Sequence, residues 1–396
     1  MSALDGVRVL CVGQFYFAPY CTMLLGRLGA DVIKVESPAG DPYRHVPTGV
    51  DADFAVQYGL VNSGKRNISI NLRTEQGATI FKRLVETADV VVQNLAPGAF
   101  DRFGLGYEEL SRVNPRVILA SGTGFGSFGP RAGQPAMDLT VQALTAVMST
   151  TGFPDGAPVR TGPSVVDFIA GSHLAAAVLA ALFERTITGR GQHVEVALQD
   201  AIIPSLSSNI AGYVSSGGSI PERTGNRNGG LAVSPYNAYE ASDGWLALIC
   251  PTDAHWRRMR DLIDDPRAHD ARLDTNKARC AAMDKVDDIV AHWVRGHTRA
   301  EIVDRLADVN VLCEPVVTLP ELLADEHVKA RGVVREVVDQ SGRWWAFGSP
   351  IFMSASPQRE PLRPEAKGQS TDSILAGDLG LTEAEIAALR ASNSIA

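Results

Sequence analysis

The chain has 396 residues, of which 45% are hydrophobic and 21% charged, and its formal net charge is -8. This length predicts two domains, because it exceeds what one small core usually organises. The acidic balance argues against a nucleic-acid partner, since nucleic-acid-binding domains carry a basic surplus on one face. A small polyanionic ligand is still compatible with it, because a few local basic residues are enough to hold one.

The composition also argues against metal, disulfide and membrane classes. Five cysteines are scattered without a CxxC pair, which favours reduced thiols over a disulfide framework or zinc site. His292 and His297 lack an HExxH pattern, so we predict no metal site. The chain begins without the basic start and apolar core of a signal peptide. The most apolar helical stretch, residues 174–183, has about half the roughly 20 residues of a membrane span. We therefore expect a cytoplasmic protein with no membrane partner.

The first half of the chain alternates β-rich runs with stretches of helical periodicity. Strands separated by helices of this length imply βαβ units and a mostly parallel sheet. From residue 239 the pattern becomes that of a smaller α+β region. Strands are predicted at residues 7–12, 31–36, 67–72, 89–92, 117–120, 193–196, 245–250 and 314–317, and helices at 19–28, 76–86, 255–263 and 300–307.

Residues 124–129 match GxGxxG letter for letter and follow a predicted strand. A dinucleotide site also requires that the glycines open a helix whose N-terminus receives the pyrophosphate. Pro130, Gly133 and Pro135 follow at once, so no helix is expected to start there. The motif therefore predicts a glycine loop that lets the backbone approach a ligand, and not a nicotinamide or flavin site.

Asp167 is expected to open a long helix that runs to about Thr188, where Gly189 is a typical C-terminal stop. One interpretation makes Asp167 only the N-cap of that helix. The other makes it a nucleophile, because the helix dipole favours an ionised carboxylate by about 0.3–1 kcal/mol. His173 is six residues further on and points about 240° around the helix from Asp167. We expect it to be a buried, hydrogen-bonded histidine and not a catalytic partner.

Four basic residues, Arg44, Lys65, Arg66 and Arg102, stand in predicted loops beside strands. Arg102 follows the turn-rich segment 94–98, which comes directly after a predicted strand. Ligands of open α/β sheets bind at the carboxyl ends of strands, so Arg102 is a phosphate candidate.

Taken together, these segments resemble the family III CoA-transferases, the group that contains formyl-CoA transferase, carnitine CoA-transferase and the related α-methylacyl-CoA racemases. The matches cover nearly the whole chain in order. They are LDGVRVL at 4–10, LGADVIKVE at 28–36, GKR at 64–66, NLAPG at 94–98, GFGSFGP at 124–130, ALFERTITGRGQ at 181–192, VALQDA at 196–201, CEPV at 313–316, ARG at 330–332 and LGLTEAEI at 379–386.

The resemblance implies a mechanism. The catalytic aspartate of the family precedes the long helix that ends in GRGQ, and that position is Asp167 here. Its carboxylate would attack an acyl-CoA to give a mixed anhydride, and the released CoA thiolate would then form an aspartyl-CoA thioester. Acyl-CoA and a small carboxylic acid would be the substrates, with no tightly bound cofactor. Asp138 matches an acidic residue near the catalytic one.

The resemblance also implies a CoA site and an architecture. The residues that it assigns to CoA are Arg102, Lys65, Arg66, Asn94, Pro97, Gly98 and Tyr16. We expect a large Rossmann-like α/β CoA-binding domain at 1–215, a smaller α+β domain at 216–330 and a C-terminal segment at 331–396 that returns to the large domain. A mobile loop over the site is expected at 226–230. Two chains would interlock as a homodimer.

Departures from the family pattern limit the reaction. Racemases have a histidine directly before the acid that aligns with Asp138. In this chain that position is Met137, whose side chain cannot exchange a proton. Formyl-CoA transferases have a glutamine where Tyr16 aligns, which disfavours formyl and oxalate substrates. Ser37 and Pro38 replace a basic residue that some members have after the second strand. A racemase or epimerase and an inactive CoA-binding protein remain as alternatives, and the sequence does not identify the acids.

Overall fold

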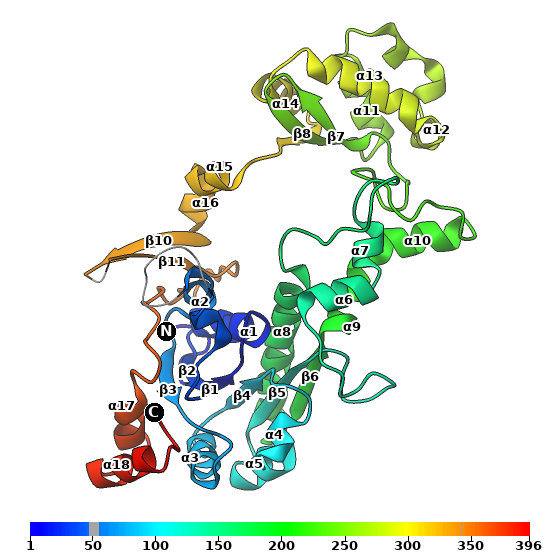
Figure 1. Ribbon diagram of the computed structural model, residues 1–396. Helices are drawn as coiled ribbons and strands as arrows, with labels where there is room; N and C mark the ends of the chain where they lie inside the picture. Colours follow the sequence, from blue (N-terminus) through cyan, green and yellow to red (C-terminus); the bar gives the residue numbers. More distant parts are fainter. Residues whose placement is uncertain (47–54, 341) are drawn as a thin grey trace. The chain divides into compact units, whose positions relative to one another are not determined.

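The computed structural model describes residues 1–46, 55–340 and 342–396, and its contacts divide them into two compact units (Figure 1). Unit 1 consists of residues 1–141, 164–202 and 323–396. Unit 2 consists of residues 142–163 and 203–322. The chain thus leaves unit 1 twice and returns to it twice. The domain division expected at residues 215 and 330 remains a prediction.

The centre of unit 1 is a six-stranded sheet with the order β3-β2-β1-β4-β5-β6, in which every neighbouring pair is parallel. This finding confirms the mostly parallel α/β sheet predicted from the sequence. The order reverses between β1 and β4, so the connections that leave these two strands turn to opposite faces of the sheet. The strands are β1 (Arg8–Val12), β2 (Asp31–Glu36), β3 (Arg66–Ser69), β4 (Val90–Gln93), β5 (Ile118–Thr123) and β6 (His193–Ala197).

Helices cover both faces of this sheet, as the near-continuous apolar strands require. On one face, Leu10, Ile33 and Val91 pack with helices α3, α4, α5, α17 and α18. Helices α1 and α8 pack on the strands of the other face and on each other. The helices of unit 1 are α1 (Phe17–Arg27), α2 (Val56–Asn62), α3 (Glu75–Val85), α4 (Ala99–Arg102), α5 (Tyr107–Val113), α8 (Val165–Thr188), α9 (Leu198–Ile202), α16 (Glu326–Arg331), α17 (Thr371–Gly377) and α18 (Glu383–Ala391). Helices α6 (Asp138–Leu144) and α15 (Leu319–Ala324) contain residues of both units.

Helix α8 has 24 residues and ends at Gly189, whose φ of 72° is the left-handed conformation that glycine adopts readily. By length and composition alone, α8 is long and apolar enough to cross a membrane. The argument from the short stretch 174–183 was therefore wrong, because the apolar helix is longer than that stretch. Its contacts with α1, α9, β5 and β6 are those of a core helix.

The carboxyl end of β2 holds buried charges that fix the loop after it. The Lys34 ammonium lies 2.7 Å from the Asp41 carboxylate, and both side chains are 1% exposed. Burial alone would lower the pKa of Lys34, and Asp41 raises it above its usual value. Glu36 pairs with Arg44 at 2.8 Å and accepts a hydrogen bond from Tyr58 at 2.6 Å. Breaking such a pair would leave an uncompensated buried charge, so the loop 37–44 is held rigidly.

The segment near the end of the chain returns to the sheet of unit 1. Strands β10 (Val334–Asp339) and β11 (Gly342–Phe347) form an antiparallel hairpin. Thr382 and, three residues later, Glu385 have the spacing that predicts a capping box. This box is present at the start of α18, with the Thr382 hydroxyl and the Glu385 carboxylate bonded reciprocally. Beyond α18, Ile395 forms an antiparallel bridge with Ile70, just after β3.

Unit 2 contains a three-stranded antiparallel sheet with the order β7-β8-β9. Trp256, Ile289 and Leu306 from three helices pack on this sheet in one buried cluster. The strands and helices of unit 2 are α7 (Val147–Thr150), α10 (Ser207–Ser215), β7 (Tyr236–Ala241), β8 (Gly244–Ile249), α11 (Asp253–Arg260), α12 (Asn276–Ala281), α13 (Met283–Arg295), α14 (Arg299–Asp308) and β9 (Leu312–Pro315).

Candidate active site

Asp167 lies in a pocket of about 480 Å³ at the carboxyl ends of β1, β4, β5 and β6, which we call the Asp167 pocket. This is the crevice that the reversal of strand order opens. Most of its surface is apolar, and among its described lining residues Asp167 alone carries a charge. The lining consists of Gln14, Phe15, Phe17, Asn94, Leu95, Ala96, Pro97, Gly122, Thr123, Gly124, Gln134, Pro135, Ala136, Met137, Thr140, Asp167 and Leu198.

The glycine loop 124–129 opens no helix, as the sequence predicted, and its first residue, Gly124, lines this pocket. The next helix, α6, begins at Asp138. Gly124 is required by packing, because a Cβ there would meet the Cβ of Ala136 at 2.5 Å. Met137 also lines the pocket, on the segment that leads from this loop into α6.

Asp138 caps the helix that carries Asp167. Its Oδ2 accepts hydrogen bonds from the backbone N–H of Val166 at 2.9 Å and of Asp167 at 3.3 Å. Ser164 occupies the N-cap position, but its side chain makes no capping bond. The interpretation of Asp167 as the N-cap is therefore wrong: Asp167 is the third residue of α8, and a carboxylate from another helix satisfies the N–H groups.

The pKa of Asp167 is raised to about 7, first by burial and second by the negative charge of Asp138. The sequence argument from the helix dipole predicted the opposite direction. It failed because burial disfavours the charged carboxylate of Asp167, and because Asp138 engages the N–H groups of the helix and adds a like charge beside Asp167. Among the described residues, no donor is bonded to the Asp167 carboxylate. A carboxylate of raised basicity in an apolar pocket is a competent nucleophile at neutral pH.

The loops after β1 and β4 are tied together at the edge of the pocket. The Asn94 side chain accepts from the Gln14 N–H at 2.8 Å and donates to the Gln14 carbonyl at 3.0 Å. Pro97 lines the pocket, and Gly98 has a φ of 68° at the start of α4. Arg102, at the end of α4, is exposed and donates to the Pro97 carbonyl at 3.2 Å. Asn94 and Pro97 thus line this pocket, whereas Gly98 and Arg102 do not, and the assignment of these residues to CoA stays a prediction.

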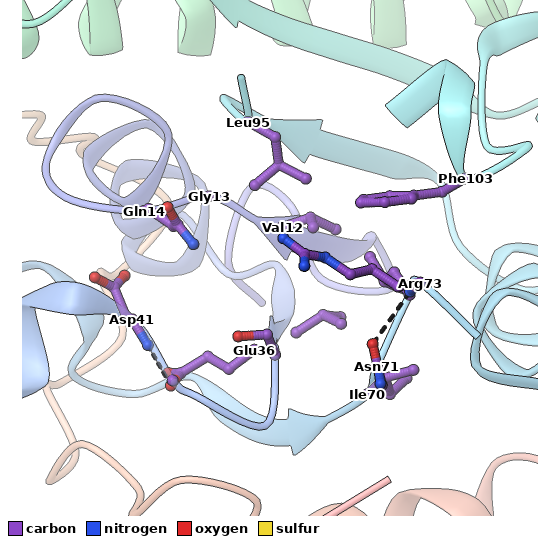
Figure 2. Close-up of a pocket in the computed structure, with 14 residues that line it drawn as sticks. Val12, Gly13, Gln14, Glu36, Asp41, Ile70, Asn71, Arg73, Leu95 and Phe103 are labelled. Atoms are coloured by element: carbon purple, nitrogen blue, oxygen red, sulfur yellow. Dashed lines mark hydrogen bonds between the residues drawn. The ribbon is translucent and has the colours of Figure 1, made fainter. Parts of the chain in front are cut away.

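A second pocket, of about 160 Å³, lies at the carboxyl ends of β1, β2 and β3 (Figure 2). We call it the Arg73 pocket, because the Arg73 side chain extends across it (Figure 2). The carboxylates on its wall are already engaged: Glu36 pairs with Arg44, and Asp41 pairs with Lys34. In the described part of the chain, no carboxylate is paired with Arg73. This guanidinium is thus available to an anionic ligand.

The two pockets share Gln14 and Leu95, so they are neighbouring parts of one groove along the strand ends. Sequence reasoning missed Arg73. It follows β3 in the segment 70–73, and the rule about strand ends that selected Arg102 would have selected it too.

The turn that carries Arg73 is held by residues near the end of the chain. The Ser394 carbonyl accepts from the Asn71 N–H at 2.9 Å, and the Ser394 hydroxyl accepts from Thr74 at 3.2 Å. The Asn71 side chain in turn accepts from the Arg73 N–H at 3.2 Å, a bond visible in Figure 2. This arrangement fixes the backbone from which the Arg73 side chain reaches into the pocket.

Lys65 and Arg66, which the resemblance assigned to CoA, do not line either pocket. Lys65 is 4% exposed, and its ammonium donates to the Pro19 carbonyl at 2.8 Å and to Asn62 at 3.0 Å. Burial lowers the pKa of Lys65 to about 7. Arg66 pairs with Asp31 at 2.6 Å and also with Asp378. Because Arg66 and Asp31 begin their strands, this pair lies at the amino edge of the sheet, opposite the pockets.

Two further sequence predictions have a clear placement. Tyr16 immediately precedes α1, between Phe15 and Phe17 of the Asp167 pocket, and its ring packs on Phe168 at 5.1 Å between centroids. His173 is exposed, so the expectation of a buried histidine was wrong. It lies on the outer side of α8.

The glycine loop at 226–230, expected to be mobile, lies in unit 2 and is bonded to α13. The Arg227 guanidinium lies 2.6 Å from both the Asp284 and the Asp287 carboxylates. Asp287 also accepts hydrogen bonds from Tyr239 at 2.7 Å and Asn237 at 3.0 Å. Within the described residues, no three His, Cys, Asp or Glu side chains are grouped in a way that would hold a metal ion.

Comparisons with known proteins agree with the geometry. Residues 4–371 match the family model described as CoA-transferase family III. The chain is 37% identical to succinyl-CoA:mesaconate CoA-transferase of Haloarcula marismortui, over 94% of this chain and 96% of that one. It is 32% identical to formyl-CoA:oxalate CoA-transferase of Streptomyces coelicolor, over 100% and 99% of the two chains. The crystal structure of a CAIB/BAIF family protein from Brucella suis has a TM-score of 0.83 and 32% identity, covering 95% of this chain and 99% of that one.

The raised pKa of Asp167 has a consequence for stability. Its folded-state value of about 7 lies above the unfolded value of about 4, so the folded state binds more protons between these pH values. The free energy of unfolding of the wild type should therefore lose a contribution as the pH rises from about 4 to about 7. Asp167→Asn carries no proton there and should be more stable than the wild type at pH 8, on the order of 1–3 kcal/mol, but not at pH 4.

Urea unfolding at both pH values measures this difference. Asp155→Asn, which alters an exposed carboxylate outside the pocket, is the control and should show no such pH-dependent gain. An equal effect of Asp167→Asn at pH 4 and pH 8 would contradict the raised pKa.

Proposed function

The chain belongs to CoA-transferase family III, and from this premise we propose that it transfers coenzyme A from an acyl-CoA to a carboxylic acid through covalent intermediates on Asp167. Transfer of CoA between acids is the activity for which the curated relatives above are named. The covalent route is supported chiefly by one observation: the carboxylate of raised pKa in an apolar pocket at the strand ends.

The steps balance without ATP or a redox partner. The Asp167 carboxylate attacks the thioester carbonyl, and the CoA thiolate leaves with the electron pair of the C–S bond. The thiolate then attacks the Asp167 carbon of the mixed anhydride, which releases the first acid and leaves an aspartyl-CoA thioester. The acceptor carboxylate attacks this thioester, and the returning thiolate takes the new acyl group from the second anhydride. One thioester bond is present before and after each exchange, so its free energy is conserved.

The two pockets suggest how CoA lies. CoA carries its thiol and its nucleotide at opposite ends of a long molecule, so one pocket alone does not accommodate it. The thioester would lie at Asp167, and the pantetheine arm would pass Gln14 and Leu95. The phosphates would meet Arg73, with Arg102 on the neighbouring loop. Some family members have a basic residue after the second strand, where Ser37 and Pro38 stand in this chain. Arg73, which follows the neighbouring strand β3, would supply that positive charge instead.

Exclusion of water is a requirement of this chemistry, because an anhydride hydrolyses. The Asp167 pocket is suited to this role, since most of its surface is apolar. No tightly bound cofactor is part of the proposal.

The proposal includes a homodimer in the cytoplasm, with the two chains interlocked. In support, the outer face of α8 carries large apolar side chains that unit 1 leaves uncovered: Phe183 is 70% exposed and Ile187 is 76% exposed. A second copy that covers them would remove this apolar surface from water. Two interlocked chains cannot separate while they are folded, so subunits would exchange between dimers only after unfolding.

The first prediction concerns Asp167 as the covalent site. The protein would be incubated with a panel of acyl-CoAs, including succinyl-, acetyl- and formyl-CoA, and trapped with hydroxylamine or borohydride. Peptide mass spectrometry should find the modification on Asp167. Asp167→Ala should lack it and should lose at least about 10³-fold in kcat for CoA transfer.

The alternatives predict different outcomes of the same experiment. Deuterium wash-in at the α-carbon of the acyl group without an acceptor acid, and no adduct, would favour a racemase or epimerase. Binding of CoA with neither adduct nor deuterium exchange would favour an inactive CoA-binding protein.

A second prediction separates Arg73 from Arg66. Arg73→Ala should raise the Kd for CoA about 10-fold, because a charge-assisted bond to phosphate is lost, and the loss should shrink for dephospho ligands or at high salt. Arg66→Ala is the matched control, since its guanidinium pairs at the opposite edge, and its Kd should change less than twofold. Isothermal titration calorimetry measures both. A larger effect of Arg66→Ala than of Arg73→Ala would overturn this placement of CoA.

A third prediction concerns the dimer. Phe183→Glu puts a charge on the outer face of α8 and should shift the protein from dimer to monomer in analytical ultracentrifugation. Mixing tagged and untagged wild-type dimers should give no mixed dimers until denaturant is added. Rapid exchange under native conditions would contradict interlocking, and a monomeric wild type would contradict the dimer itself.

A further inference from the structure

The end of β4 is braced from both sides where the two pockets meet. Leu95 lines both the Asp167 pocket and the Arg73 pocket, and Figure 2 shows its side chain at the latter. Asn94 ties this segment to the loop after β1 through its two hydrogen bonds with Gln14. Gln93 bonds toward β5 instead: its side-chain oxygen accepts from the Leu95 N–H at 2.9 Å, and its nitrogen donates to the Ser121 hydroxyl at 2.9 Å.

The hydrogen bonds continue across the sheet from Ser121 to His193. Ser121 on β5 is the register partner of Gln93 on β4. His193 on β6 is the register partner of Leu119, two residues before Ser121, so the side chains of His193 and Ser121 project from the same face. Nε2 of His193 lies 2.9 Å from the Ser121 hydroxyl. A chain of three hydrogen bonds thus leads from the Leu95 backbone to the edge strand of the sheet.

The direction of this chain follows from its end at Leu95. A backbone N–H can only donate, so the oxygen of the Gln93 amide faces Leu95 and its NH2 group faces Ser121. The Ser121 hydroxyl therefore accepts from Gln93. Because Ser121 is only 4% exposed, its own proton needs a protein acceptor, and in the described part of the chain His193 is the acceptor within reach. His193 thus accepts at Nε2 and carries its proton on Nδ1.

The surroundings of His193 favour the neutral ring that this arrangement needs. Although His193 lies on the edge strand, the Tyr107 ring stacks on it at 6.2 Å between centroids. Burial lowers the pKa of His193 below its usual value, and the opposing charges of Glu195 and Asp101 do not cancel this effect. A neutral imidazole accepts the proton of Ser121, whereas an imidazolium could only donate.

We propose that Gln93 is a positioning residue for the substrate: its hydrogen bonds to Leu95 and Ser121 keep the wall shared by the two pockets in the shape that the pantetheine arm of CoA requires. The inference rests on the proposed function, which places that arm beside Leu95. Gln93 is not among the described residues that line either pocket, so it acts through Leu95. Without Gln93, the Leu95 N–H would lose its partner, and the wall would no longer be held in one conformation.

The test measures the Kd for CoA by isothermal titration calorimetry and the steady-state kinetics of CoA transfer. Gln93→Leu removes both hydrogen bonds and retains a side chain of similar size. It should raise the Kd for CoA and the KM for acyl-CoA about 5- to 10-fold, because the bonds that hold the wall are lost, and should lower kcat less than about threefold. Ser121→Ala should raise the Kd about 2- to 5-fold, and adding it to Gln93→Leu should cause no further rise, since Ser121 acts through Gln93.

Two further variants separate the hydrogen bonds from general effects of substitution. Gln93→Glu keeps an acceptor for the Leu95 N–H, and its second oxygen can accept the proton of Ser121, so its Kd for CoA should stay within about twofold of wild type. Gln192→Leu is the matched control, because it breaks a 2.7 Å bond to Glu184 beside His193 but outside the chain to Leu95. Its Kd should also stay within about twofold.

Circular dichroism and thermal unfolding establish that each variant is folded. If Gln93→Leu does not fold, the comparison of Ser121→Ala with Gln192→Leu carries the test, and equal Kd values of that pair would overturn the proposal. A folded Gln93→Leu with the Kd of wild type would overturn it too, as would a loss of kcat at unchanged Kd, which would place the effect at Asp167.

The direction of the hydrogen bonds has its own spectroscopic signature. Long-range proton–nitrogen correlation spectra of protein with labelled histidines report which ring nitrogen of His193 is protonated, and His193→Gln assigns the signal. The wild type should carry the proton on Nδ1. A proton on Nε2 would contradict the chain as described.

Failure of the underlying function is distinguishable from failure of this inference. Asp167→Asn is assayed in the same series, and the wild type must transfer CoA while Asp167→Asn does not. If that difference is absent, the covalent function itself is wrong. If it is present and the Gln93 and Ser121 variants bind CoA as the wild type does, only the positioning role of Gln93 is wrong.

Discussion

The strand order of the parallel sheet is the constraint on which the site depends. Because the order reverses between β1 and β4, the chain leaves these adjacent strands toward opposite faces and opens a crevice at their carboxyl ends. The reciprocal hydrogen bonds between Gln14 and Asn94 hold the edges of that crevice at a fixed separation. Both pockets are built from the loops that end there.

Within that crevice, the first turn of α8 sets the chemistry. A helix N-terminus normally favours an ionised carboxylate, but here the N–H groups of Val166 and Asp167 are bonded to Asp138. Asp138 thereby anchors the helix and at the same time repels a second negative charge. Burial, which is the larger cause, and this repulsion together raise the pKa of Asp167 to about 7.

The basic residues show how weakly local sequence predicts a ligand contact. Lys65, Arg66 and Arg73 lie within nine positions of one another, around the short strand β3. Lys65 is buried against α1, Arg66 pairs with acids at the amino edge, and only Arg73 reaches the carboxyl edge and the pocket. A parallel strand separates its two ends by its full length, so a shift of a few residues moves a charge from one edge of the sheet to the other.

The sequence by itself determined the α/β class, the parallel sheet, the helix from near Asp167 to Gly189, the capping box at Thr382 and the absence of a helix after the glycine loop. These features follow from periodicity, cap residues and prolines, which act over a few neighbouring residues. The family was also recognisable from ordered motifs. Only the tertiary structure decided that Asp138 caps α8, that the pKa of Asp167 rises, that Arg73 faces the groove and that His173 is exposed. Each of these depends on groups far apart in the chain, and burial and Coulomb interactions between them are fixed only when the chain has folded.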